Sequence, residues 1–331
     1  MDYIVLGCLA IDNIVNAQGI TKLNQFGGNA AYGGAGIHIW DSGEIGLVSR
    51  KGNDFPEAWI KELQDYGIDT KGIKKVDESH LMTSGMLYDS YGNREELVFN
   101  EDNQTDESKE GFPTMTPWEV TKAHDLFAPE IHDIPADYIG AAVMIGARHY
   151  DRQLSYANFL REQNPEGIII MDTGKDYMKP EYELKLPELL RKVDVLLPSE
   201  SEVCGLFGFD VDMEWAARRL CRMGAKAVVI KLGVKGCLIY QAIEDKIHYV
   251  PVFPANVQDP TGAGDSFCGG FLAGLKESGD LIQAAMYGAV SASFIIEHFG
   301  VEAVLKIKRH EALKRLDYLR TVMNGGNING K

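Results

Sequence analysis

Residues 259–267 hold the residue types that can bind a phosphate group and accept a proton. They read Asp-Pro-Thr-Gly-Ala-Gly-Asp-Ser-Phe, and the apolar residues that follow recur at helical spacing. The small residues Gly262 to Gly264 let backbone N–H groups converge at the N-terminus of this predicted helix, where the helix dipole also favours negative charge. Asp265 then falls in the first helical turn, beside those N–H groups. The stretch predicts an anion site next to a carboxylate; the alternative is a glycine-rich turn in which Asp265 only complements the helix dipole.

The same stretch closely resembles the C-terminal signature of the PfkB, or ribokinase-like, carbohydrate kinases. The resemblance covers most of the chain, and residues 259–271 are its specific part. In this family the second Asp of the signature is the catalytic base and contacts the substrate, which implies these roles for Asp265. The Gly-Ala-Gly of the signature forms the anion hole, which implies that role for Gly262, Ala263 and Gly264.

Length, charge and cysteine content restrict the class of protein. A chain of 331 residues could hold about two average domains, although an α/β fold of this size is often one domain with an appendage. The net charge of −15 repels nucleic acid and anionic lipid, so we expect neither as a partner and any phosphate site to be local. The five cysteines are widely spaced and form no Cys-x-x-Cys pair, which argues against a disulfide framework and a zinc site. No run approaches the roughly 18 apolar residues of a membrane span, so we expect a cytoplasmic protein.

The N-terminal part of the chain holds candidate substrate ligands. Residues 3–9 predict a buried strand, and Asp12 follows where strands of an open parallel sheet deliver residues to a ligand crevice. From the residues alone Asp12 is either a turn residue or a substrate ligand. The resemblance implies the second role, because kinases of this family use an Asp here to hold sugar hydroxyls.

A glycine-rich helical segment follows, beginning Gly-Gly-Asn-Ala-Ala at residue 27. Each glycine costs roughly 0.8 to 1 kcal/mol of helix stability relative to alanine, so we expect a close approach to the backbone, either by a ligand or by tight packing against the sheet. The resemblance implies that Gly28 and Asn29 contact the sugar. Tyr32, however, stands where the family usually has Asn.

Residues 13–26 and 80–100 predict a small β-sheet. Short alternating runs at 82–87 and 97–99 flank a turn at 90–93. We interpret these segments as a lid over a kinase core formed by residues 1–12, 27–79 and 101–323, with 324–331 as a C-terminal tail. A lid of roughly two to four strands exposes its edges, and the resemblance implies that two lids pair in a homodimer.

The rest of the chain predicts an α/β fold with a doubly wound, mostly parallel sheet flanked by helices, which is the ribokinase-like architecture. Strand-like runs at 141–145, 167–171, 194–197 and 227–230 alternate with helical segments. Asp54 can N-cap an earlier helix of this kind. Arg148 lies just past a strand end, as does Asp172, so Arg148 is either a surface residue or a bidentate ligand for a substrate carboxylate or phosphate.

Two further motifs bear on nucleotide and metal. Ser199 and Glu202 form a capping box, but they also stand where the family has Asn-x-x-Glu, whose Glu organises Mg²⁺ through water. Residues 230–236 resemble the family's nucleotide-binding turn, and Lys231 replaces the commoner Thr as a mobile point charge for phosphates. Helices expected at 280–298 and 302–323 would wall the adenine pocket. The resemblance as a whole implies ATP contacts at Ser199, Lys231, Gly233, Gly236, Thr261, Gly262 and Gly264, and a K⁺ ion beside Asp259.

These observations predict an ATP- and Mg²⁺-dependent kinase that phosphorylates a hydroxyl of a small sugar or sugar derivative. In the inferred mechanism Asp265 accepts the hydroxyl proton, the Gly-Ala-Gly amides hold the phosphoryl group, and Mg²⁺ offsets its charge with the help of Glu202. The alternatives are a nucleoside kinase of the same family and a catalytically silent protein that binds ligand and regulates. The presence of Asp265 argues against the silent protein. Ribose, fructose, a sugar acid and a nucleoside are not distinguished.

Overall fold

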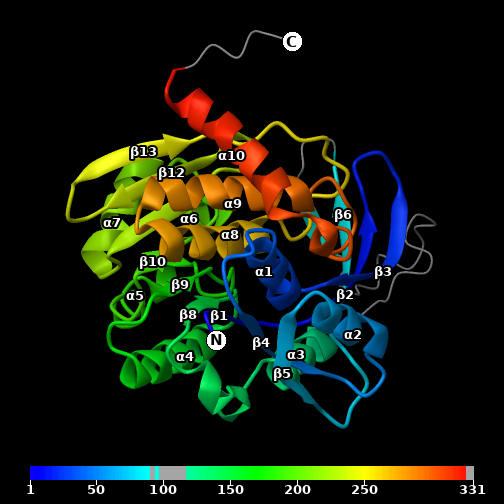
Figure 1. Ribbon diagram of the computed structural model, residues 1–331. Coiled ribbons are helices and arrows are strands. Elements are labelled where there is room, and N and C mark those ends of the chain that lie inside the picture. The colour runs from blue at the N-terminus through cyan, green and yellow to red at the C-terminus, as the bar shows by residue number, and fades with distance from the viewer. Residues whose placement is uncertain (90–93, 97–116, 326–331) are drawn as a thin grey trace.

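The computed structural model describes residues 1–89, 94–96 and 117–325. Within these residues the chain forms a nine-stranded sheet with helices on both faces, and a separate four-stranded sheet at one side (Figure 1). The predicted fold class is therefore confirmed. None of the described helices is both long enough and apolar enough to span a lipid bilayer.

The strands of the central sheet are, in spatial order, β13 (Lys246–Val250), β12 (Cys237–Gln241), β11 (Ala227–Lys231), β10 (Val195–Leu196), β9 (Ile169–Met171), β8 (Ala142–Ile145), β1 (Tyr3–Leu6), β4 (Ile45–Lys51) and β5 (Ile68–Lys75). The sheet is parallel from β5 to β11 and antiparallel beyond. Strand β1 pairs with β4 on one side and β8 on the other, so Tyr3 lies opposite Ile45 and Ala142. Among the strands of this sheet only β12 reverses direction, because it pairs antiparallel with both β11 and β13.

Each face of the sheet has its own apolar core, because side chains alternate along a strand. In β1, Tyr3 and Val5 enter one core while Ile4 and Leu6 enter the other, and all four are buried. The first core is covered by α1 (Asn29–His38), α2 (Glu57–Asp65), α8 (Ala263–Ser278), α9 (Leu281–Ile295) and α10 (Arg309–Met323). The second is covered by α4 (Tyr150–Gln163), α5 (Leu186–Leu190), α6 (Glu200–Phe207) and α7 (Met213–Met223).

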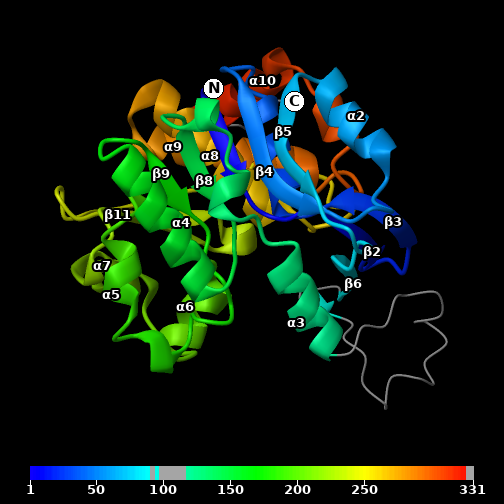
Figure 2. The ribbon, with the colours of Figure 1, turned by 90° about the horizontal axis from the view of Figure 1, so that it is seen from below.

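The small sheet contains strands from two distant parts of the chain. Its order is β3 (Thr21–Gly27), β2 (Ala10–Val15), β6 (Thr83–Tyr88) and β7 (Arg94–Glu96). Helix α3 (Pro117–Leu126) lies near β6, apart from the other helices (Figure 2). The predicted strand at 97–99 and the turn at 90–93 fall outside the described residues, and the division into core and lid at the expected residues stays a prediction.

We expected Asp12 to follow directly on a strand of the central sheet, but it does not. The first central strand ends at Leu6, not at residue 9, and the chain then enters β2, in which Asp12 is buried. Because β2 pairs with β3 and β6, Asp12 belongs to the small sheet. The expectation was wrong because a single apolar run from Tyr3 to Ala10 contains two short strands with a break between them.

Glycines bring α1 and α8 into close contact. A side chain at Gly36 would overlap the Ser266 carbonyl, and one at Gly269 would overlap the Gly33 carbonyl. Gly33 also faces the sheet, where an added Cβ would lie 2.8 Å from the Met144 sulfur. Of the two explanations for the glycine-rich helix, tight packing thus accounts for these positions, and it fixes α8 against α1.

The helix after β4 begins later than Asp54. Its N-cap is Pro56, and Asp54 Oδ1 instead accepts a hydrogen bond from the His80 amide at 2.6 Å. The helix ends at Asp65, and Gly67 follows it with φ +79°, a conformation that favours glycine. The helix expected at 302–323 is divided into a short 3-10 turn, Val304–Lys306, and α10.

Candidate active site

The N-terminus of α8 has the local geometry that its sequence predicts. Gly262 is the N-cap with φ +76°, a left-handed conformation that favours glycine, and a side chain there would overlap the Tyr32 ring. Asp265 lies in the first turn. The Ala263 amide, one of the three expected anion donors, donates to the Pro260 carbonyl at 3.2 Å. The Ser266 amide donates back to Gly262 at 2.9 Å, which leaves amides of the intervening turn for an anion.

Two cavities lie on either side of this helix N-terminus. The first, of about 250 Å³, is lined by Asp12, Gly28, Asn29, Thr261, Gly262 and Asp265 among others. The second, of about 150 Å³, is lined by Lys231, Gly233, Gly236, Ala263 and Gly264 together with apolar side chains. Thr261, expected at the nucleotide, therefore lies on the other side of the turn. We call these the acceptor cavity and the nucleotide cavity.

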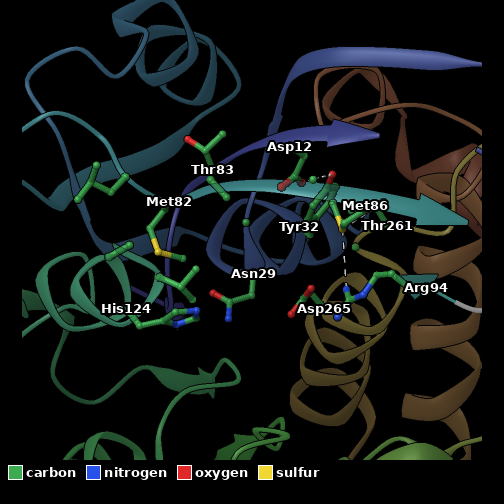
Figure 3. A pocket seen from close by; sticks show the side chains of 17 residues that line it. Asp12, Asn29, Tyr32, Met82, Thr83, Met86, Arg94, His124, Thr261 and Asp265 are labelled. Carbon is green, nitrogen blue, oxygen red and sulfur yellow. Dashed lines mark hydrogen bonds between the residues drawn. The ribbon is translucent and has the colours of Figure 1, made fainter. Parts of the chain in front are cut away.

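Within the acceptor cavity, Tyr32 joins Asp12 to the turn before α8. Its hydroxyl donates to Asp12 Oδ2 at 3.0 Å, and its ring packs against Gly262 (Figure 3). Gly27 has no Cβ, and one there would overlap the Asp12 carboxylate. The sequence showed Tyr32 only as a departure from the family pattern, whereas the structure makes it part of the cavity.

Asn29 holds two strand ends together beside the acceptor cavity. Its Oδ1 accepts from the Cys8 amide at 2.7 Å, and its Nδ2 donates to the Ala147 carbonyl at 3.0 Å. Both polar atoms thus bond to the backbone. Gly28, directly before it, caps α1 with φ +93°.

Asp265 has the electrostatic surroundings of a base that works near neutral pH. Burial raises the pKa of its carboxyl to about 7, the negative charge of Asp172 adds to this rise, and the positive charges of Lys231 and Arg94 oppose it. A carboxyl that titrates near neutrality can accept a proton and release it again, which suits general base catalysis.

Lys231 and Asp172 form a buried ion pair beside the nucleotide cavity. Lys231 Nζ lies 2.7 Å from Asp172 Oδ1, and the two side chains are only 14% and 8% exposed. Burial alone would lower the pKa of Lys231, but the attraction of Asp172 outweighs it and holds that pKa above its ordinary value. The partner was not foreseen, although both residues stand at the ends of strands, β9 and β11, that flank β10.

The turn after β11 lines one edge of the nucleotide cavity. Gly233 and Gly236 both have positive φ, +58° and +88°, and a side chain at Gly236 would overlap the Val250 carbonyl. The turn therefore requires glycine at these positions, as the sequence pattern indicates. Along one wall α9 supplies Ala289, Ala292 and Ser293.

Arg148 lies behind the acceptor cavity rather than on its surface. It is 6% exposed, its Nη1 is 3.2 Å from His124 Nδ1, and its Nε is buried without a hydrogen-bond partner among the described residues. Burial lowers the pKa of Arg148 to about 10. His124, which lines the cavity, carries no signal in the sequence, because the histidines show no metal-ligand spacing and its helix is distant from the motifs.

Ser199 and Glu202 form the predicted capping box at the start of α6. Ser199 Oγ accepts from the Glu202 amide at 3.3 Å, while Glu202 Oε2 accepts from the Ser199 amide at 2.7 Å. The same oxygen accepts from Thr173 Oγ1 at 2.7 Å. The capping explanation thus holds, and it ties Glu202 to the strand end that carries Asp172. Neither Ser199 nor Glu202 lines the two cavities.

Asp259 carries an unsatisfied buried oxygen. Its Oδ1 accepts from Thr261 Oγ1 at 2.6 Å and from the Thr261 amide at 2.9 Å, whereas its Oδ2 has no hydrogen-bond partner in the described structure. Burial raises the pKa of this carboxyl to about 6. Since the Thr261 hydroxyl donates to Asp259, it accepts from the Tyr88 hydroxyl at 2.9 Å, which links β6 to the turn.

Comparisons with known proteins agree with this geometry. The profile of the pfkB family carbohydrate kinases matches residues 4–308. The cytidine kinase of Thermococcus kodakarensis is 29% identical over 305 residues, which cover 91% of this chain and 98% of that protein. The nucleoside kinase of Burkholderia thailandensis in complex with inosine superimposes with a TM-score of 0.71 at 17% identity, covering 98% of this chain and 99% of its own. A putative ribokinase II from E. coli in complex with ATP and Mg²⁺ gives 0.69 at 20% identity, covering 96% and 99%.

Proposed function

Because this chain belongs to the pfkB family of carbohydrate kinases, and is a phosphotransferase that acts on a hydroxyl group, we propose that it transfers the γ-phosphoryl group of ATP to a small sugar or a nucleoside. One observation carries the proposal. The acceptor and nucleotide cavities lie on opposite sides of one helix N-terminus, with Asp265 on the acceptor side and Gly264 on the other. This arrangement allows an in-line transfer across the turn.

In the proposed nucleotide site, ATP occupies the cavity beside α9. Its apolar wall, which includes Val252 and Phe253, suits the adenine ring, and Lys231 with Gly264 stands at the end that suits the phosphates. The ribokinase-like neighbour that binds ATP and Mg²⁺ supports this reading. Among the described residues no cluster of His, Cys, Asp or Glu could hold a metal by itself. We therefore expect Mg²⁺ to bind mainly to the ATP phosphates and to offset their charge, with Glu202 acting through water.

In the proposed mechanism, Asp265 accepts the proton of the attacking hydroxyl as its oxygen bonds to the γ-phosphorus of ATP. The bond from that phosphorus to the β,γ-bridging oxygen breaks, and ADP leaves. The amides at the start of α8 bind the phosphoryl oxygens, and the buried charge of Lys231 adds to this stabilisation. Asp12 hydrogen-bonds other hydroxyls of the acceptor, and Tyr32 fixes the orientation of its carboxylate. Most of the rate acceleration comes from positioning and from preorganised charge, as is usual for phosphoryl transfer.

We also propose that a monovalent cation such as K⁺ binds beside Asp259. A buried carboxylate oxygen without a donor is costly unless a cation or a proton compensates it. A cation there would hold Asp259 ionised, and through Thr261 it would stiffen the turn before α8.

A nucleoside is a second candidate acceptor, and the far end of the acceptor cavity favours it. Leu81, Met82, Val120 and Ala123 give the cavity an apolar wall. Met82 lies away from Asp265, on the other side of Asn29 (Figure 3). A bare sugar offers little surface to such a wall, whereas a planar base would bury against it. The cytidine kinase of Thermococcus kodakarensis, similar along nearly its whole length, is consistent with this candidate.

The decisive test is a transfer assay across acceptor classes. The purified protein would be incubated with ATP and Mg²⁺ and with ribose, fructose, gluconate or cytidine, and the phosphorylated product would be identified by mass spectrometry. We expect transfer to at least one of these acceptors, and transfer slower by about 10²- to 10⁴-fold with Asp265→Asn. Hydrolysis of ATP without a phosphorylated acceptor across the whole panel would count against the proposed function.

We propose that two subunits pair through the small sheet. Strand β3 lies at its edge and is mostly exposed, and the neighbouring apolar residues Ile20 and Leu23 are 43% and 37% exposed. An edge strand with exposed apolar side chains gains stability from pairing with a second chain. Light scattering that gives a monomer mass at micromolar concentration, with full activity, would contradict this pairing.

A further inference from the structure

Arg148 is a buried cation without a carboxylate partner among the described residues. Its one hydrogen bond there is the contact of Nη1 with His124, while Nε is buried and unpaired. A buried guanidinium is unfavourable unless an anion or several acceptors compensate it. Among the described residues the charge of Asp265 attracts Arg148, but no carboxylate forms an ion pair with it.

The contact with Arg148 fixes the protonation pattern of His124. A guanidinium can only donate, so His124 Nδ1 must be the acceptor, and a neutral imidazole then carries its proton on Nε2. His124 lines the acceptor cavity, and its side chain projects there from α3 (Figure 3). The cavity wall thus presents a histidine whose ring is oriented, and made electropositive, by the arginine behind it.

This histidine lies at the end of the cavity away from the reacting group. In Figure 3, Asn29 stands between His124 on one side and Asp265 with Arg94 on the other. A ligand whose hydroxyl reaches Asp265 would therefore place a different part of itself at His124. The apolar residues Met82, Val120 and Ala123 adjoin the same end.

We propose that Arg148 and His124 form a subsite for an oxygen atom of the substrate that accepts a hydrogen bond. This oxygen lies at a distance from the hydroxyl that is phosphorylated. His124 contacts this oxygen, and Arg148 is a positioning residue that acts through His124 and supplies the charge. The inference rests on the proposed function for its assumption that the acceptor hydroxyl lies at Asp265. Two sources fit the shared chemistry: the carboxylate of a sugar acid and the ring carbonyl of a nucleobase.

Matched pairs of ligands distinguish these sources. Cytidine would be compared with 1-β-D-ribofuranosylbenzene, which keeps the ring and lacks the carbonyl, and D-glucuronate with D-glucose, which keeps the sugar ring and lacks the carboxylate. Each ligand is measured twice, by kcat and KM for transfer in the parent enzyme and by the calorimetric Kd in Asp265→Asn. We expect the oxygen-bearing member of one pair to be preferred by about 10- to 100-fold, in KM and Kd more than in kcat.

Variants then assign that preference to the two residues. His124→Leu and Arg148→Met should both remove it, and Arg148→Lys should restore part of it to the extent that the charge matters. Arg152→Met is the matched control: Arg152 lies in α4, which begins two residues after Arg148, and pairs with Glu130 at 2.8 Å, outside the acceptor cavity. It should keep the full preference. An unchanged KM for ATP and an unchanged Tm show that a variant is folded. If Arg148→Met is not folded, the result for His124→Leu alone tests the subsite.

The outcomes separate the subsite from the proposed function. Transfer without a preference in either pair, or a preference that survives His124→Leu, would overturn the subsite while leaving the kinase activity intact. A preference in Kd without any transfer would overturn the proposed function and support the subsite. Absence of both binding preference and transfer would overturn both.

Discussion

Two buried cations flank the turn before α8, and the protein treats them differently. Lys231, on the nucleotide side, has a carboxylate oxygen 2.7 Å away. Arg148, on the acceptor side, has a histidine nitrogen at 3.2 Å and an unpaired Nε. Burial shifts both pKa values downward, but only for Lys231 does a neighbouring carboxylate reverse the shift. Among the described residues the charge of Lys231 is thus balanced by an ion pair, whereas that of Arg148 has no such pair.

This difference matches the two ligands that the cavities would receive. A nucleotide brings several negative charges whichever acceptor is used, so a cation with its own counter-ion can shift between Asp172 and phosphate. The acceptor must be recognised by a small number of groups, and an unbalanced charge discriminates strongly between ligands with and without a matching oxygen. We therefore expect replacement of the two cations to have different effects on the stability of the fold, on the pH dependence of turnover and on acceptor selectivity.

The largest expected effect concerns the residue that both sides share. Asp265→Asn is nearly isosteric and should lower kcat by about 10²- to 10⁴-fold, because it removes the proton acceptor. KM for ATP should change little, since the nucleotide cavity is not altered. Turnover and Tm would be measured on one preparation. A lowered Tm with turnover kept within a few fold would show instead that Asp265 only stabilises the helix N-terminus.

Removing the balanced cation should strongly destabilise the fold. Lys231→Met leaves Asp172 buried without its partner, so we expect the free energy of unfolding to fall by about 3 to 5 kcal/mol. The double variant Lys231→Met/Asp172→Asn should recover part of this loss, because no unpaired charge remains. Urea denaturation of the parent and the variants measures both. A loss below about 1 kcal/mol in Lys231→Met would mean that the pair is not balanced as we describe.

The pH dependence of turnover tests how the two sides act on Asp265. Its pKa of about 7 predicts a rate that rises by about tenfold per pH unit below that value and levels off above it. Lys231→Met should move this limb to higher pH, since Lys231 opposes the rise of that pKa. A limb that stays near the parent position would show that Lys231 does not act on Asp265.

Stability should respond to pH in the opposite direction. The folded-state pKa of Asp265 lies above its ordinary value of 3.8, so the folded protein binds the proton more tightly than the unfolded chain does. The contribution of Asp265 is therefore fully present below about pH 4 and is lost as the pH rises through 7. The difference in unfolding free energy between the parent and Asp265→Asn, followed from pH 4 to 8, should shrink or reverse with rising pH. A difference that is constant over this range would contradict the assignment.

The smallest effect is expected for the unbalanced cation. Arg148→Met removes a buried charge that has no carboxylate, and replacing such a group by an apolar one of similar size is often close to neutral. We expect a change in unfolding free energy within about 1 kcal/mol of the parent. Arg161→Met, in the following helix α4, is the control, because Arg161 donates to the Lys192 and Gly167 carbonyls and pairs with Asp194 at 3.0 Å. If Arg148→Met lowers the free energy of unfolding more than Arg161→Met does, the charge of Arg148 is compensated within the folded protein and our interpretation is wrong.

The parts of the site that the sequence predicted are those fixed by local geometry. The helix N-terminus at residues 262–264, the first-turn position of Asp265 and the capping box at Ser199 all follow from residues within a few positions of one another. The parallel sheet followed from its alternation with helices, because strand and helix periods differ plainly over such lengths.

The parts that the sequence missed depend on contacts between distant segments. Asp172 meets Lys231 only because β9 and β11 flank the same strand, and His124 meets Arg148 only because α3 lies beside the segment that follows β8. Asp12 was placed on the wrong sheet because the short break between β1 and β2 leaves no mark in an apolar run. Such pairings could be found from a sequence only with knowledge of which strand ends are neighbours.

The strand order has a consequence for how the protein is synthesised. From β1 the sheet grows through β8, β9, β10, β11, β12 and β13 in the order in which the ribosome delivers them, so each new strand can join an existing edge. Helices α8 and α9, which cover one face and carry Asp265, come only afterwards. A nascent chain that has passed β13 therefore holds the strands of this sheet while only α1 and α2 cover this apolar face. We expect such a chain to need chaperone protection until the last helices emerge, and protease sensitivity of ribosome-stalled chains, lost only after residue 295, would show it.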